Sequence, residues 1–218
     1  MKQPSRPLPA LAAVVLLAGL VPALQGCFPV VAAGAGAGAL MISDRRYAET
    51  YLADEAIEIR AANRAGEKFG DKIHLNVTSY NRMVLLTGEV PDATTRAEVE
   101  RTVGSVPNVK AVTNELQVAG ISSFGARGND TYISSKVKAR FIDANKFAAN
   151  HVKVVTEAGV VYLLGIVTQK EADAAVEVAR TTGGVQKVVK VLEVISDEEA
   201  RRLDARPAEN AAGKQSQP

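Results

Sequence analysis

The feature that most constrains the fold of this chain is an internal repeat of nearly 80 residues. Blocks at 50–52, 76–78, 84–90 and 104–109 return at 131–133, 153–156, 161–167 and 183–188. Solenoid repeats are shorter, roughly 20–50 residues each. The sequence therefore predicts two copies of one small domain.

The second copy begins with a predicted helix at 131–147. Ile133, Val137 and Phe141 recur every four residues, which places them on one helical face. Asp130 stands directly before this segment and is a suitable N-cap. These residues predict an amphipathic helix packed on a core.

A matching helix is predicted at 47–65 in the first copy, and two strands follow in both copies. Apolar and polar residues alternate over 73–77, which is typical of a half-buried strand. Turn residues at 81–82 and 158–159 make the two strands of each copy a hairpin.

A second helix and a last strand complete each copy. Thr168 and Glu171 have the spacing of a capping box. The last strands are predicted at 109–118 and 187–195, and a crossover through a helix makes them parallel to their neighbours. The predicted fold class is α+β, with two tandem αββαβ domains, each packing two helices on one face of a three-stranded mixed sheet.

The chain starts with basic residues and an apolar run over 8–24, as a secretory signal does. The run ends in Leu24-Gln25-Gly26-Cys27, which resembles the bacterial lipobox, so Cys27 is predicted to be the lipidated first residue of the mature protein. A plain signal peptide and an uncleaved transmembrane helix are the alternatives. The residue after Cys27 is Phe28. An aspartate at this second position would resemble an inner-membrane retention signal, and it is absent here. We therefore expect a lipid-anchored outer-membrane protein that faces the periplasm.

Composition divides the rest of the chain. Residues 28–42 are uncharged and rich in Gly and Ala, which favours a flexible tether over a membrane-inserted segment. The polar end of the chain predicts disorder. The predicted organisation is a signal peptide at 1–26, a lipidated N-terminus and tether at 27–46, domains at 47–119 and 130–196, a linker at 120–129 and a disordered tail at 197–218.

The repeat resembles the BON domain. The first copy carries this resemblance in Asn76-Val77-Thr78, Val84-Leu85-Leu86-Thr87-Gly88 and Gly104-x-Val106-x-x-Val109, and the second in Val154-x-Thr156, Leu163-Leu164-Gly165 and Gly184-Val185-x-x-Val188. The segment 129–137 is similar to the dual-BON outer-membrane lipoproteins of Gram-negative bacteria. This resemblance implies binding of anionic phospholipids, such as phosphatidylglycerol or cardiolipin, through the second domain. It also implies a role in outer-membrane integrity, recruitment to division sites, and outer-membrane-assembly or division proteins as further partners.

The distribution of charge points to the same domain independently of the resemblance. The mature chain is neutral, with 24 basic and 24 acidic side chains. Residues 47–119 carry 8 basic and 11 acidic side chains, whereas residues 127–195 carry 10 basic and 7 acidic ones. The second copy is therefore the better candidate for an anionic surface.

The predicted lipid-binding residues are Tyr132, Lys136, Lys138, Ile142 and Lys146. They lie on the side of the helix away from its core residues, where an aromatic ring among lysines suits a headgroup interface. An exposed helix face or an inter-domain contact is the alternative. The related family carries Trp at the position of Tyr132.

Tyr51 matches Tyr132 in the first copy, so a structural role for both tyrosines stays open.

No catalytic residue, metal ligand or cofactor site is predicted, and we expect neither an enzyme nor a nucleic-acid-binding protein. His74 and His151 have no second ligand at metal spacing and are expected to be exposed. Gly88 and Gly165 are expected to serve close backbone contacts at matching places in the two sheets. A scaffold for envelope-assembly or peptidoglycan-remodelling proteins is the alternative function.

A Cys27→Ser substitution removes the thiol that would carry the first acyl chain. We expect the variant to incorporate no labelled palmitate and to leave the outer-membrane fraction, because several acyl chains are needed for firm anchoring. Metabolic labelling and envelope fractionation measure both effects. Palmitate on the variant, or wild-type protein mainly in the inner membrane, would contradict the prediction.

Overall fold

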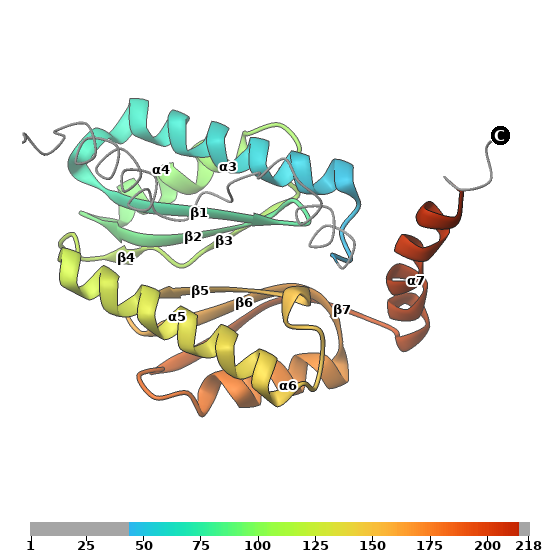
Figure 1. Ribbon diagram of the computed structural model, residues 1–218. Helices are drawn as coiled ribbons and strands as arrows, with labels where there is room; N and C mark the ends of the chain where they lie inside the picture. Colours follow the sequence, from blue (N-terminus) through green and yellow to red (C-terminus); the bar gives the residue numbers. More distant parts are fainter. Residues whose placement is uncertain (1–43, 214–218) are drawn as a thin grey trace, which may run out of the picture. The chain divides into compact units, whose positions relative to one another are not determined.

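The computed structural model describes residues 44–213, in which the two repeats form two separate sheets with their own helices (Figure 1). The predicted signal peptide, Cys27 and most of the predicted tether lie outside this range, as do residues 214–218. None of the helices within 44–213 combines the length and hydropathy that a membrane-spanning helix needs.

Both repeats have the predicted order of elements. The first repeat consists of α3 (Ala48–Phe69), a 3-10 turn (Gly70–Lys72), β1 (His74–Tyr80), β2 (Met83–Val90), α4 (Ala93–Gly104), β3 (Ala111–Asn114) and β4 (Gln117–Val118). The second consists of α5 (Phe124–Ala144), a 3-10 turn (Ala149–His151), β5 (Val152–Glu157), β6 (Val160–Thr168), α6 (Gln169–Arg180) and β7 (Lys187–Ile195). One more helix, α7 (Asp197–Gly213), follows the second repeat.

Strand pairing confirms the predicted mixed sheets. β1 and β2 are antiparallel, and β3 and β4 both run parallel to β2, so together they occupy the third position of the first sheet. In the second sheet β5 and β6 are antiparallel and β7 is parallel to β6. The two sheets remain separate, as two tandem domains require.

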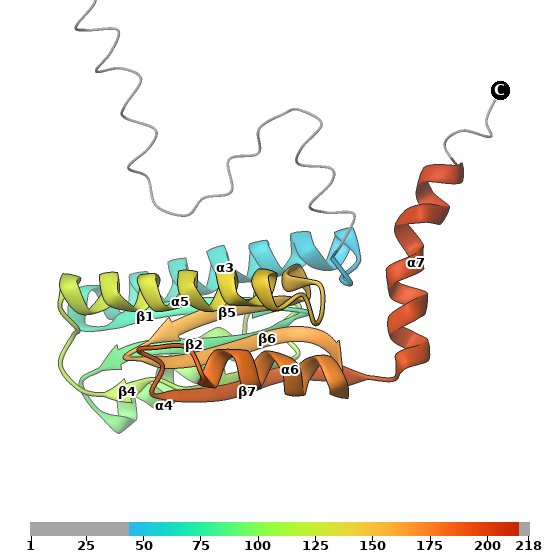
Figure 2. The same ribbon diagram turned by 60° about the horizontal axis from the view of Figure 1, so that its bottom comes forward.

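The helices of each repeat cover one face of its sheet. In the second repeat Ile133, Val137 and Phe141 of α5 pack against alternate residues of β6 and against α6. Ile57 and Ala61 of α3 have the same place in the first repeat. Figure 2 shows α5 along the β5 side of its sheet with α6 beside it.

The face of each sheet that its own helices leave uncovered contributes to a third apolar cluster, which contains residues of both repeats. Tyr80 and Leu85 of the first repeat pack there with residues of β6 from the second, namely Tyr162, Leu164 and Ile166. Each sheet thus has helices on one face and the other repeat on its second face.

A buried aspartate in the first helix holds the hairpin turn of each repeat. Asp130 accepts hydrogen bonds from the backbone N–H groups of Ala158 and Gly159, both at 2.9 Å. The prediction that Asp130 caps the helix is wrong, because α5 begins earlier. Its N-cap is Ser123, whose hydroxyl accepts the N–H of Ala126 at 3.2 Å.

Asp54 has the same role in the first repeat. Its carboxylate accepts the N–H of Asn81 at 2.9 Å and that of Arg82 at 2.7 Å. Both turn residues have positive φ, as a two-residue hairpin turn of this kind requires.

Gly88 and Gly165 confirm the predicted close approaches. A Cβ atom on Gly88 would lie 2.0 Å from the carbonyl oxygen of His74, and one on Gly165 would lie 2.3 Å from that of His151. The two glycines therefore occupy equivalent places in the two sheets and exclude any side chain there.

The predicted linker is shorter than expected, because residues 124–129 belong to α5. Two glycines, Gly125 and Gly128, made this stretch look like a linker, since glycine disfavours helix. The N-cap at Ser123 and the packing of the rest of α5 outweigh that preference.

The prediction of a disordered tail over 197–218 is wrong for the part that the structure describes. Ser196 accepts the N–H of Glu199 at 3.1 Å and starts α7. Ala200 and Leu203 are buried. Asp204 pairs with the buried Arg45 at 2.8 Å. Apolar burial and this ion pair therefore order a polar segment that composition alone suggested to be disordered.

We expect Asp130→Ala to lower the free energy of unfolding by about 2–4 kcal/mol, because it leaves two turn N–H groups without their charged acceptor. Asp143→Ala is the matched control, since Asp143 lies on the same helix and is exposed; it should change stability by less than about 0.5 kcal/mol. Urea denaturation of both variants measures the difference. Equal stabilities would show that Asp130 does not hold the turn.

Candidate functional site on helix α5

Helix α5 is anchored by one face, and this decides which residues it presents outward. Its buried residues recur at intervals of three or four: Asp130, Ile133, Val137 and Phe141. The helix ends at Asn145, which adopts the left-handed conformation with φ 46°. The side opposite the buried residues faces away from the core.

An uncharged stripe runs along this outward side, and we call it the α5 stripe. Its large members are Phe124, Tyr132 and Ile142, which are 87%, 61% and 68% exposed. At 100° per residue they lie within about 80° of one another around the helix axis. The exposed residues between them are small: Gly128, Ser135 and Ala139. The alignment of three large exposed apolar side chains along one side of a helix makes the α5 stripe a candidate binding surface.

Basic side chains flank the α5 stripe on both sides. The helical angles place Arg127 and Lys138 along one border and Lys136 along the other, where the acidic Asp143 also lies, while Arg140 lies nearer the buried face. Asp143 is the exposed acidic residue of the helix. The combination of an apolar centre with basic borders matches a helix that lies in a headgroup layer.

Two of these cations lie over the aromatic rings of the stripe. The guanidinium carbon of Arg127 is 5.1 Å from the centroid of the Phe124 ring. The Nζ of Lys136 is 4.6 Å from the centroid of the Tyr132 ring, and it donates a hydrogen bond to the carbonyl oxygen of Gly183. Each exposed aromatic residue thus carries a positive charge at its ring.

The remaining basic residues differ in whether their side chains form hydrogen bonds within the protein. Arg140 donates hydrogen bonds to the Val178 carbonyl at 3.1 Å and to Thr182 at 2.8 Å, so it ties α5 to α6. Lys138 is exposed and forms no ion pair or hydrogen bond with the described residues. Lys146 is exposed but lies in the loop after α5, because the helix ends before it.

The C-terminal end of the α5 stripe opens into a hollow of about 450 Å³. Lys138 and Ile142 line it from α5, and Arg46, Tyr51 and Lys153 line it from other elements. Arg46 lies two residues before α3, near the start of the described residues. The described chain therefore begins beside the stripe.

Helices α3 and α5 do not align in the way that the match of Tyr51 with Tyr132 suggests. The buried residues of α3, namely Asp54, Ile57, Ala61 and Ala65, recur 76 residues later in α5. In this alignment the counterpart of Tyr132 is Ala56. Tyr51 instead lies under Arg46, at 4.8 Å from its guanidinium carbon. The equivalence of Tyr51 and Tyr132 is therefore wrong, and Tyr132 is free of that structural role.

Helix α3 also exposes apolar side chains, Leu52 and Ile59. The charged residues outside the buried face of α3 are of both signs: Glu49, Glu55, Glu58 and Glu67 with Arg60, Arg64 and Lys68. The two helices thus share an apolar outward side and differ in the charge that borders it.

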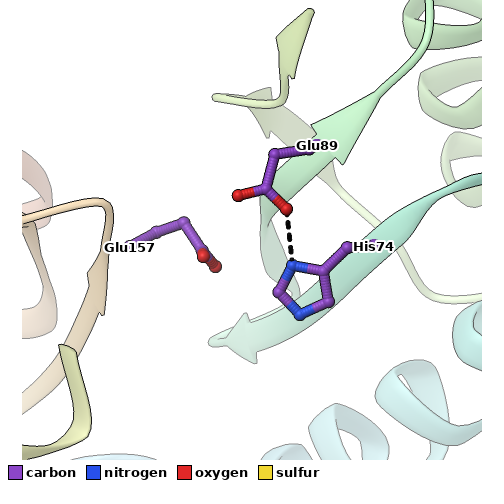
Figure 3. A group of neighbouring side chains, drawn as sticks. All are labelled: His74, Glu89 and Glu157. Atoms are coloured by element: carbon purple, nitrogen blue, oxygen red, sulfur yellow. Dashed lines mark hydrogen bonds and ion pairs between the residues drawn. The ribbon is translucent and has the colours of Figure 1, made fainter. Parts of the chain in front are cut away.

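The prediction that both histidines are exposed is wrong. His151 is buried, and His74 donates to or accepts from Glu89 at 2.8 Å in a partly buried position. Glu157 also approaches His74 (Figure 3). Both histidines lie at the start of a hairpin whose outer side is covered by other elements, which sequence alternation could not reveal.

Comparison with known proteins decides the family. The BON-domain family profile matches residues 58–120 and 129–196, which together make up more than half of the chain. The chain belongs to the BON-domain family. We refer to its two repeats below as BON domain 1 and BON domain 2.

Three relatives extend this result. The outer membrane lipoprotein DolP of Haemophilus influenzae is 34% identical over 84% of this chain and 95% of its own length. The 21 kDa hemolysin of Actinobacillus pleuropneumoniae is 32% identical over 70% of this chain and 79% of its own length. The osmotically-inducible protein Y of Escherichia coli is 30% identical over 52% of this chain and 58% of its own length. The likeness to DolP confirms the predicted relationship and the predicted outer-membrane location.

Sequence analysis missed Phe124 and Arg127, which it assigned to the linker. The pair Ser122-Ser123 before Phe124 was an available signal for a helix start. Of the five predicted residues, Tyr132, Lys136, Lys138 and Ile142 lie on or beside the α5 stripe, and Lys146 lies beyond its end.

Proposed function

We propose that BON domain 2 binds anionic phospholipids, such as phosphatidylglycerol or cardiolipin, through the α5 stripe and its basic borders. The observation that carries this proposal is the exposure of Phe124, Tyr132 and Ile142 beside the basic side chains of Arg127, Lys136 and Lys138. Cys27 anchors the protein in the outer membrane on the periplasmic side. Through this contact the protein supports outer-membrane integrity, with division sites as its place of action.

The energies fit a weak surface contact that the lipid anchor makes effective. Each basic residue near an anionic surface contributes about 1 kcal/mol. Burial of apolar area adds about 25 cal/mol per Å². Because the anchor already holds the chain at the membrane, α5 binds in an effectively intramolecular step and needs little affinity of its own. The start of the folded chain beside the stripe supports this arrangement.

The comparison between the two domains supports BON domain 2 rather than BON domain 1. Leu52 and Ile59 of α3 are exposed in the same manner, yet four acidic and three basic side chains lie outside the buried face of that helix. The same count for α5 gives four basic side chains and one acidic one. The near balance of charge on α3 gives little attraction to an anionic membrane. The exposed apolar residues of α3 instead favour a protein partner, so a scaffold for envelope-assembly, division or peptidoglycan-remodelling proteins is the second candidate function.

We expect Tyr132→Glu and Phe124→Glu each to abolish most binding to vesicles that contain phosphatidylglycerol, because a carboxylate replaces an apolar ring at the headgroup level. Thermal stability should stay within about 0.5 kcal/mol of wild type, since both rings are exposed. Co-sedimentation with vesicles and thermal melting measure the two effects.

Ile59→Glu on α3 is the control, because it places the same charge at an exposed apolar position of BON domain 1. It should leave lipid binding intact. Folded Tyr132→Glu and Phe124→Glu proteins that bind as wild type does would refute the lipid surface and favour the scaffold.

A charge test uses Arg127→Gln combined with Lys138→Gln. Removing two basic residues should weaken binding by about 2 kcal/mol, or roughly 30-fold, and should flatten its dependence on salt. Vesicle binding at low and high ionic strength measures this. The control removes two exposed basic residues of BON domain 1, Arg60→Gln with Lys72→Gln, and should have a much smaller effect. Equal losses in both pairs would mean that net charge alone drives binding.

A further inference from the structure

Three ionisable side chains converge between the two sheets (Figure 3). His74 begins β1, and Glu89 lies opposite it near the end of β2, in a direct strand pair. Glu157 ends β5 in the other sheet. One donor atom from each of the three lies within 4.8 Å of the other two. In Figure 3 the carboxylate of Glu157 points toward the His74 ring.

This cluster is shielded from solvent. The side chains of His74 and Glu89 are 16% and 6% exposed, and Glu157 is 4% exposed. The His74 Nδ1 lies 2.8 Å from Glu89, and the amide of Asn76 donates to Glu157 at 2.8 Å. Two carboxylates therefore lie close together in a space with little access to solvent.

His74 is the basic side chain that lies against these carboxylates, and its contact with Glu89 is an ion pair only when the ring is protonated. Within residues 44–213, neither Glu89 nor Glu157 forms an ion pair with a lysine or an arginine. Buried carboxylates in proteins are usually paired with a cation or bound to a metal. With a neutral His74 ring, the two carboxylates therefore have no permanently charged counter-ion among the described residues.

BON domain 2 shows how the equivalent place is balanced. His151 corresponds to His74, because their carbonyl oxygens lie against the equivalent glycines Gly165 and Gly88 of the neighbouring strands. Its ring nitrogens lie 3.8 Å from Glu171 and from Asp204. There Arg45 pairs with both carboxylates, at 2.6 and 2.8 Å. A histidine beside two carboxylates thus has an arginine as a permanent cation in one domain and, among the described residues, no paired lysine or arginine in the other.

We propose that His74, Glu89 and Glu157 bind a divalent transition-metal ion, with Zn²⁺ as the best match. One imidazole nitrogen and two carboxylate oxygens suit Zn²⁺, whereas Ca²⁺ and Mg²⁺ prefer oxygen ligands alone. Water completes the coordination. His74 ligates as the neutral imidazole, with its single proton on the ring nitrogen that does not bind the metal, and a protonated ring releases its second proton to solvent.

Such an ion would link the two BON domains. His74 and Glu89 come from the first sheet and Glu157 from the second, so coordination requires both sheets to stay together. Metal binding would therefore add to the apolar contact between Leu85 and Tyr162 that the same faces share. This site is independent of the α5 stripe.

The first experiment uses the full mature chain without an affinity tag and with Cys27→Ser, which keeps it in solution and removes its only thiol. After treatment with a chelator, the protein is titrated with ZnCl₂ in a calorimeter. We expect one Zn²⁺ per chain with a Kd below about 10 µM, and a higher melting temperature when the metal is present. The absence of uptake by the folded protein would overturn the proposal.

The second experiment locates the site. His74→Gln and Glu157→Gln should each weaken Zn²⁺ binding by at least about 30-fold and abolish the rise in melting temperature. His151→Gln and Glu193→Gln are the controls, the first at the matching histidine and the second at a glutamate that bonds Asn81 of the other domain. Both controls should bind as wild type does. Uptake that is equal in all four variants would place the metal elsewhere and overturn the proposal.

Should the site variants fail to fold, Co²⁺ added to the otherwise wild-type chain decides the question. A bound Co²⁺ ion with one nitrogen and several oxygen ligands in a four-coordinate site gives visible absorption bands. Saturable bands at one ion per chain would support the site, and their absence would overturn it.

Discussion

The structure depends on what covers the face of each small sheet that its own helices leave bare. Two helices cover one face, and a three-stranded sheet left bare on the other would expose a row of large apolar residues. Here the second faces pack on one another, with Leu85 and Tyr80 against Tyr162 and Leu164. Because apolar burial is the main favourable term in folding, this contact fixes which residues become interior. It buries His74, Glu89 and Glu157, and it leaves the outward sides of α3 and α5 to face other partners.

The two BON domains preserve the parts that the backbone requires and differ in the parts that face a partner. Both retain a buried aspartate on the hairpin turn and a glycine where two strands approach too closely for a side chain. These positions allow little choice, because a turn N–H needs an acceptor and a Cβ would collide with a carbonyl oxygen. The outward positions carry no such constraint. Ala56 in one helix and Tyr132 in the other, or Glu89 and Ile166 at matching strand positions, are where function can diverge.

The proposed lipid surface also explains why a modest stripe suffices. A short interfacial helix with few basic neighbours binds weakly by itself, and its contribution falls as salt screens the charges. A lipid anchor changes this, because the chain is already concentrated at the membrane and only has to orient α5. The rings of Phe124 and Tyr132, each beside a cation, would set that orientation. Anchor and stripe are therefore complementary parts of one attachment.

The sequence by itself determined the repeat, the αββαβ order, the hairpin turns, the capping box and the glycines at strand ends. All of these depend on residues close together in the chain, whose periodicity and turn chemistry are local properties. It also identified four residues on or beside the α5 stripe, because helical periodicity separates an outward side from a core side. Only the tertiary structure decided the rest. Two glycines hid the first turns of α5, and with them Phe124. The charged composition hid α7, which Arg45 and a few apolar contacts hold in place. The grouping of His74 with Glu157 came from sheet packing between residues 83 positions apart, and no local pattern encodes which distant face will cover a strand.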